Sequence, residues 1–394
     1  DGEDLLSDRK RYDWNGNGLL EEYEFLNETI LSADLGEGFG DSHVMGLLNP
    51  ATGDYSALER VELDGLTLTR GNAAFDAHGG GGLYSEMPVT VRNCQFLINR
   101  TPYYGGAISA NDIEVYATLF GGNEVSGLSD EAGGRGGAIY IHDGGRAVIV
   151  NSVIYNNSAR IGSAYYGGAG SKVDFVNNTI VRNAWSGDPQ GVVDQGTTLY
   201  AESPEAGNRL WNTVVWGNDD LMPLNKGHWS VVTSASDADP SVADDFQIFL
   251  DRVNTAVTGP RFGLPSDQSG AAHYFASVNY SLPSLSVLVN AGTNGGSRKL
   301  DTDADGNIVA GEVTLDGNEG YYRTQHEYGR TNVPDTLNGK WRINREPDTY
   351  KYVRIDGVEM IDVATWKEGT IDIGAYEYES VALTPFGGNI IYVK

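Results

Sequence analysis

Two acidic segments of the chain carry oxygen-bearing side chains at the spacing of a calcium-binding loop. The first, DWNGNGLLEEYE, begins at Asp13. In such a loop, short oxygen side chains at alternate positions converge on one hard cation, a glycine permits the sharp turn, and the last glutamate binds through both oxygens. The positions that match are Asp13, Asn15, Asn17, Gly18, Leu19 (through its carbonyl) and Glu24. Flanking segments of helical character predict a calcium-binding helix-loop-helix; the alternative is the same acidic element without metal.

The second acidic segment, DTDADGNIVAGE, meets the same template with more charge. Its matching positions are Asp301, Asp303, Asp305, Gly306, Asn307 and Glu312. The flanks are less helical, so we expect a loop-only calcium site here, against the alternative of an ordinary polar turn. Because two asparagines replace carboxylates in the first loop, we expect the first site to bind calcium more weakly than the second.

Aromatic pairs form a third group of candidates. Tyr103 with Tyr104 and Tyr165 with Tyr166 precede similar glycines, and Trp185 lies in the segment AWSGD. If the pairs occupy equivalent places two turns of a repeat apart, strand spacing puts them roughly 10 Å from each other, a distance that suits stacking on sugar rings. The alternative is that one tyrosine of each pair packs inward and the other covers a loop.

Composition excludes several functions. The formal charge of −27 disfavours nucleic acid and anionic membranes and favours cations. The only cysteine, Cys94, allows no intramolecular disulfide and is predicted to be a core residue. The 6 histidines are scattered without a zinc-ligand spacing. No apolar run is long enough to span a bilayer, so no direct membrane span is expected.

The elements that must position these residues are predicted by a repeat. The GGA motif recurs at Ala107, Ala138 and Ala169, at intervals of 31 and 31 residues. A second series, NCQFLIN, ATLFGGN, NSVIYNN, NNTIVRN and NTVVWGN, closes each time on an asparagine, while the linkers between its members vary. Fixed internal spacing with variable linkers indicates stacked rungs. The closing residues are Asn99, Asn123, Asn157, Asn183 and Asn218.

Short β-branched segments with period two surround those asparagines and show no helical periodicity. We therefore predict an all-β fold, a right-handed parallel β-helix in which stacked asparagine amides satisfy one another and glycines form tight corners. A propeller is disfavoured because the hairpin turns of its blades are missing.

These residues resemble a known family. The pairing of FxxN with GGAI (QFLINRTPYYGGAI) looks like the polymorphic outer-membrane protein repeat, and ELDGLTLTRGNA is similar to a first rung of related surface β-helices. GPRF, NYSLPSLSVLVNAG and IDIGAYEYE resemble the closing region of choice-of-anchor Q type Gram-negative surface proteins. The resemblance implies an extracellular, outer-membrane-associated location. Since GGNIIYVK looks like the first strand of a further module, we expect a longer parent chain.

Four regions follow. We expect an EF-hand-like helix-loop-helix at 1–34, a β-helix region at 35–235, a loop-rich closing cap at 236–380 and a linker at 381–394. Within the β-helix region, we expect the first rung to start near Glu59. The preferred function is a non-enzymatic, calcium-binding surface protein that binds a glycan or a surface protein in adhesion. A polysaccharide lyase or glycoside hydrolase of the pectate-lyase-like β-helix class is the alternative, although no catalytic motif is recognisable. A structural component of a larger surface assembly is the third possibility.

Overall fold

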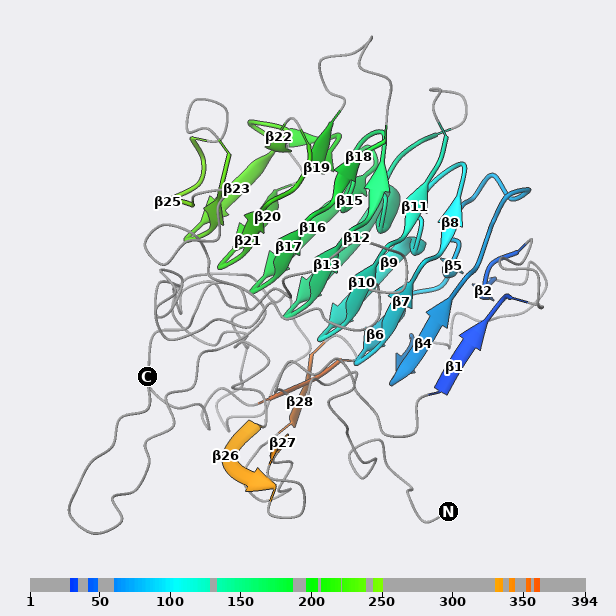
Figure 1. The fold of residues 1–394 in the computed structure, drawn as a ribbon, viewed down its shortest axis with the longest axis horizontal. Coiled ribbons are helices and arrows are strands. Elements are labelled where there is room, and N and C mark those ends of the chain that lie inside the picture. The colour runs from blue at the N-terminus through cyan, green and yellow to red at the C-terminus, as the bar shows by residue number, and fades with distance from the viewer. Residues whose placement is uncertain are drawn as a thin grey trace.

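The described part of the chain consists of β-strands. The computed structural model describes residues 29–34, 42–48, 60–127, 133–186, 196–204, 207–220, 222–238 and 244–250, with four short strands nearer the C-terminus. No α-helix occurs among these residues. In Figure 1 the strands from β1 to β25 lie side by side as a continuous stack. The predicted all-β class is confirmed for this part.

The chain passes repeatedly through the same sheets, and we call one such pass a rung. One rung consists of β9 (Ile108–Tyr116), β10 (Leu119–Gly121) and β11 (Glu124–Val125). The next consists of β12 (Ile139–Val150), β13 (Val153–Tyr155) and β14 (Ser158–Ala159), and each strand pairs in parallel with its counterpart. This arrangement is consistent with the predicted parallel β-helix.

The remaining strands follow the same order. The nine-stranded sheet also holds β1 (Thr29–Ser32), β4 (Leu66–Thr69), β7 (Gln95–Leu97), β17 (Thr179–Val181), β21 (Val214–Trp216), β24 (Ala235–Ser236) and β25 (Ile248–Phe249). The four-stranded sheet adds β8 (Arg100–Thr101) and β18 (Ala184–Trp185). The third sheet adds β2 (Met45–Leu47), β3 (Val61–Asp64), β5 (Leu83–Ser85), β6 (Val89–Arg92), β15 (Tyr165–Gly167), β16 (Lys172–Val176), β19 (Thr197–Ala201), β20 (Asn208–Trp211), β22 (Met222–Leu224) and β23 (Trp229–Val232).

Two antiparallel pairs lie within the predicted closing region. β26 (Arg330–Asp335) pairs with β27 (Lys340–Ile343), and β28 (Tyr352–Ile355) pairs with β29 (Val358–Ile361). The sequence pattern predicts loops in this region and does not reveal these strands.

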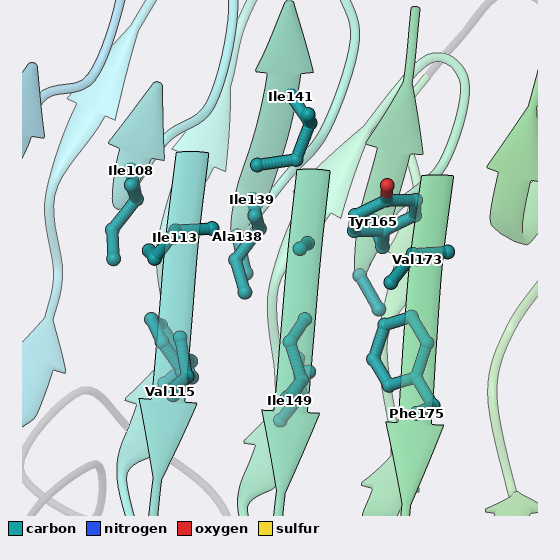
Figure 2. Packing of buried hydrophobic residues seen from close by; sticks show 14 of the residues in the cluster. Ile108, Ile113, Val115, Ala138, Ile139, Ile141, Ile149, Tyr165, Val173 and Phe175 are labelled. Atoms are coloured by element: carbon teal, nitrogen blue, oxygen red, sulfur yellow. The ribbon is translucent and has the colours of Figure 1, made fainter. Parts of the chain in front are cut away.

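Alternation along each strand builds the core. In β16, Val173 and Phe175 point inward and are fully buried, and they lie beside Ala147 and Ile149 of the preceding rung. Figure 2 shows the inward side chains of successive rungs in matching rows. Cys94 also belongs to this core, and burial raises the pKa of its thiol to about 12. The prediction that Cys94 is a core residue is therefore confirmed.

Each rung turns sharply at a residue in the left-handed backbone region. Asn151, Asn177 and Asn212 occupy one such corner in successive rungs, with φ of 51°, 53° and 46°. Asparagine tolerates this conformation better than other non-glycine residues, because its short polar side chain bonds locally. The asparagines that begin the repeated segments NSVIYNN, NNTIVRN and NTVVWGN are therefore favoured by the corners.

The asparagines that close those segments form a buried ladder. The side-chain amide of Asn123 donates to Asn157 Oδ1 at 2.8 Å, that of Asn157 to Asn183 Oδ1 at 2.9 Å, and that of Asn183 to Asn218 Oδ1 at 3.0 Å. Asn99 joins the same ladder through Asn123. The predicted stacking of asparagine amides is confirmed.

The predicted alignment of the GGA motif is wrong in its third member. Ala107 and Ala138 are equivalent, since Ile108 lies opposite Ile139. The next rung places Tyr165 opposite Ile139, so the counterpart of Ala138 is Ala164 and not Ala169. The interval shortens from 31 residues to 26 because the turn between the two rungs is shorter, and the second YYGGA copy shares letters without sharing a position.

The stack also begins earlier than predicted. β1 pairs with β4 from Thr29, whereas the sequence pattern places the second helix of the helix-loop-helix across Thr29–Leu31. β2 likewise precedes the expected start near Glu59. The error arises because the apolar residues Ile30 and Leu31 fit either element, and pairing with β4 decides for the strand. Residues 1–28 lie outside the described residues.

Candidate functional site

The predicted calcium ligands cannot be placed. Both acidic loops lie outside the described residues, so the calcium sites remain predictions. Among the residues that the structure does describe, no group of three or more His, Cys, Asp or Glu side chains is placed to hold a metal ion. The predicted calcium ligands that lie outside the described residues are Asp13, Asn15, Asn17, Leu19, Glu24, Asp301, Asp303, Asp305, Asn307 and Glu312.

The two tyrosine pairs are not equivalent. Tyr165 and Tyr166 lie on β15, where Tyr165 points into the core and is fully buried. Tyr103 and Tyr104 lie in the loop before β9, and Tyr104 is opposite Arg135. The predicted equivalence fails because it depends on the incorrect third GGA position. Since Tyr165 packs edge-on against Phe175, with ring centroids 5.3 Å apart, it is excluded as a ligand contact.

Outward tyrosines of successive rungs stack on one another. Tyr140 lies opposite Tyr166, and Tyr166 lies opposite Tyr200. Their ring centroids are 5.4 Å and 5.0 Å apart, and Tyr104 stacks on the other side of Tyr140 at 4.6 Å. We call Tyr104, Tyr140, Tyr166 and Tyr200 the tyrosine stack. Because the faces of its inner rings contact each other, Tyr140 and Tyr166 do not offer a free face to a sugar.

Two charged side chains, Arg135 and Glu202, contact the tyrosine stack at Tyr166. The guanidinium carbon of Arg135 lies 5.2 Å from the ring centre of Tyr166, a cation–π geometry. The Tyr166 hydroxyl donates to Glu202, which also lies 3.8 Å from Arg135. Burial and the Glu202 hydrogen bond raise the pKa of Tyr166, and burial raises the pKa of Tyr140 to about 12. Both hydroxyls therefore remain protonated at neutral pH.

We predict that Tyr140→Ala lowers the free energy of unfolding by about 3 kcal/mol, as for other buried aromatic truncations. The variant removes contacts with Tyr104, Tyr166 and His142 at once. Urea denaturation measures the loss, and Tyr103→Ala, at a half-buried loop position, is the matched control. Equal losses in the two variants would show that the stack adds no stability.

Three of the 6 histidines lie close together on the outer face of the third sheet, near its N-terminal strands. His43 and His78 both stack on Tyr84, with centroids 5.6 Å and 5.0 Å from its ring, and His142 meets Tyr84 edge-on at 6.2 Å. The outward position between Tyr84 and Tyr140 is the small Ser109. The imidazoles therefore occupy the place where an aromatic ring of the row is missing.

Asp76 joins two of these imidazoles. Its Oδ2 lies 3.0 Å from His43 Nε2, and its Oδ1 lies 2.6 Å from His78 Nδ1 and 2.9 Å from the His78 backbone nitrogen. Burial alone would raise the pKa of Asp76, but the hydrogen bonds from His78 and His43 outweigh it and lower the pKa to about 2. Asp76 is therefore a carboxylate that orients both rings.

Hydrogen-bond roles extend the network to His142. The Ser109 hydroxyl donates to the His78 carbonyl at 2.7 Å, so the same oxygen accepts from His142 Nε2 at 3.0 Å. Burial and the neighbouring His78 lower the pKa of His142, which is neutral at pH 7 with its proton on Nε2. His43 Nδ1 lies 2.8 Å from the Gly80 carbonyl and donates to it.

The sequence pattern does not reveal this histidine cluster because the residues are far apart in the chain. His43 and His78 lie on rungs joined by β2 and β5, and His142 begins the irregular part of β12 between Ile141 and Arg146. The one signal in the sequence is that His142 lies two residues after Tyr140 and so points to the same outer face. Finding its partners requires the register between rungs, which cannot be read from linkers of variable length.

Trp185 and Asp220 lie at another corner of the stack. Trp185 is half-buried on β18, and its neighbour Ala184 is opposite Asp219. Asp220 Oδ2 accepts hydrogen bonds from Ser163 Oγ at 2.5 Å and Thr198 Oγ1 at 2.9 Å. Burial outweighs these bonds and raises the pKa of Asp220 to about 7. The carboxyl therefore holds a proton at mildly acidic pH.

We predict that stability falls as the pH rises from about 4 to about 7, partly through Asp220, because its unfolded-state and folded-state pKa values bound this range. The folded state keeps a proton that the unfolded state, with an ordinary aspartate pKa of about 4, has already released. Asp220→Asn should therefore reduce the fall in melting temperature across this range. Asp219→Asn, which removes the smallest of the influences that raise the pKa of Asp220, should reduce it less. An identical pH dependence in wild type and Asp220→Asn contradicts the assignment.

Comparisons with known proteins give no assignment. A scan of protein-family models finds no match to the chain, and a search of curated proteins finds none. Within the described residues, no helix is long and apolar enough to cross a membrane.

Proposed function

We propose that the chain is a right-handed parallel β-helix exposed on the surface of a Gram-negative bacterium. There it binds a glycan or a surface-protein partner in adhesion, without catalysing a reaction, and calcium bound at the two acidic loops stabilises it. The family resemblance of the repeats and of the closing region supports the location, and the charge of −27 suits calcium and disfavours nucleic acid.

The single observation that supports the binding role is a group of polar and aromatic side chains on the outer face of the third sheet. Side chains able to bind a polar ligand gather there from segments far apart in sequence, as where His43, His78 and His142 meet around Tyr84. The asparagine ladder from Asn99 to Asn218 holds successive rungs of the same stack together at another corner. A rigid scaffold that presents fixed polar groups loses little entropy on binding.

A second candidate is a polysaccharide-active enzyme. The specific observation that favours it is the contact between Asp76 and His78, because a carboxylate that orients an exposed imidazole is the usual arrangement of a general base. We rank this candidate second, since a base alone does not supply the acid or the charge neutralisation that glycan cleavage needs.

Glycan-array binding of the full chain, with calcium and with a chelator, tests the proposal. We expect retention on particular glycans that decreases when calcium is removed. Mass spectrometry of the bound glycans after prolonged incubation should show unchanged lengths. Shortened glycans would favour the enzyme over the adhesin. No retention on any glycan would contradict glycan binding and leave a surface-protein partner or the structural component of a surface assembly.

A further inference from the structure

The segment from Phe75 to Gly80, which we call the His78 loop, is both exposed and held in place. Phe75 is 84% exposed, the highest exposure of a large apolar residue in the described part, and the His78 side chain is 62% exposed. Exposed loops are usually mobile and often carry binding residues, so the contacts that fix this loop bear on its role.

Several contacts from three other parts of the chain fix the His78 loop. The Gly80 backbone nitrogen donates to the Tyr104 carbonyl at 2.8 Å, Ser109 Oγ donates to the His78 carbonyl at 2.7 Å, and His43 contacts both Asp76 and the Gly80 carbonyl. Gly79 has φ of 76°, and a Cβ there would lie 1.9 Å from the Tyr104 carbonyl oxygen. The loop therefore lies directly on the Tyr104 segment.

The exposed polar atoms of the loop match a ligand that both donates and accepts hydrogen bonds. Asp76 engages His78 Nδ1 and so directs the opposite ring nitrogen, Nε2, away from the carboxylate. The carboxylate itself remains 41% exposed. An imidazole nitrogen beside a carboxylate suits a sugar hydroxyl, which is donor and acceptor at once.

The apolar part of the loop is a single ring rather than a patch. Protein–protein interfaces bury about 800 Å² per partner around an apolar centre. In the chain Phe75 lies between Ala74 and Asp76, and the other exposed large apolar residues of the described part, Ile30, Leu48 and Phe249, lie on other segments. One exposed ring beside fixed polar groups matches a pyranose, which has an apolar face and polar edges.

We propose that the His78 loop is the glycan-binding site, with the ring of Phe75 stacked on a neutral pyranose and with His78 and Asp76 bonding its hydroxyls. This inference rests on the glycan-binding function proposed above. The Asp76 carboxylate and the strongly negative chain disfavour an anionic sugar such as a uronate.

Isothermal calorimetry on the full chain in saturating calcium tests the site. The neutral probes are cellohexaose and chitohexaose, and hexagalacturonate is the anionic comparison. We expect a neutral probe to bind, Phe75→Ala and His78→Ala each to weaken it at least about tenfold, and the exposed-residue control Leu48→Ala to leave it unchanged. Melting curves matching wild type confirm that the variants are folded, and His78→Gln, which keeps a polar group, should retain part of the affinity.

The outcomes separate the two proposals. Binding of a neutral probe that survives Phe75→Ala overturns the site and leaves the adhesin function standing. Preference for hexagalacturonate overturns the neutral-sugar assignment. If none of the probes binds while the glycan array shows retention on other glycans, the function stands, and retention that survives Phe75→Ala overturns the site. If neither assay shows binding, the site and the glycan-binding form of the function both fail.

Discussion

Replacing Asn157 with alanine will lower the free energy of unfolding by about 3 to 5 kcal/mol, as expected when several buried polar groups lose their partners together. Asn157 Oδ1 accepts from both the backbone nitrogen and the side-chain amide of Asn123. Its own amide donates to Asn183 Oδ1 and to the carbonyl of Phe120. Equilibrium denaturation in guanidinium, with the slope compared to wild type, measures the loss.

Asn111→Ala is the control for this prediction. Asn111 is an exposed asparagine on β9, so its replacement should change the free energy of unfolding by less than about 0.5 kcal/mol. A similarly small change in Asn157→Ala would mean that the asparagine ladder is an incidental feature of the corners and does not hold the rungs together.

Gly137→Ala should also be disruptive, lowering the free energy of unfolding by about 3 kcal/mol or more and reducing the yield of folded protein. A Cβ at Gly137 would lie 2.1 Å from the Ser163 carbonyl oxygen and 2.8 Å from backbone atoms of Ser158. Both neighbours are main chain, and both belong to the next part of the stack, so neither can rotate away. Soluble yield and far-ultraviolet circular dichroism report the effect.

Gly46 provides the matched glycine. It lies on β2, and a Cβ added there would have nothing within 4 Å, so Gly46→Ala should be neutral or slightly stabilising. If Gly137→Ala proves as well tolerated as Gly46→Ala, the rungs do not approach each other closely at the GGA motif.

Local rules in the sequence are sufficient to predict the rungs. The segments that close on Asn123, Asn157 and Asn183 keep a fixed internal length, because the strand and the corner on either side are each determined by a few residues. The linkers obey no such constraint. The turn before Tyr165 is shorter than the one before Ile139, and only backbone pairing reveals this.

The candidate site depends on that pairing and is therefore harder to predict. Tyr166 and Tyr165 look alike in sequence, but alternation on β15 sends one outward into the tyrosine stack and the other into the core. His43, His78 and His142 come together only when three rungs are stacked in register. A spacing rule that works within one element cannot find contacts across rungs of variable length.

The proposal that calcium stabilises the protein depends on the two acidic loops. Calorimetric titration of the full chain with calcium, alongside Asp13→Ala and Asp301→Ala and with thermal melting in parallel, tests it most directly. We expect binding at two sites, a higher melting temperature with calcium, loss of one site in each variant, and weaker binding at the Asp13 loop because two of its ligands are uncharged. Absence of calcium binding would show that both loops are ordinary turns and would contradict the proposed calcium-stabilised function.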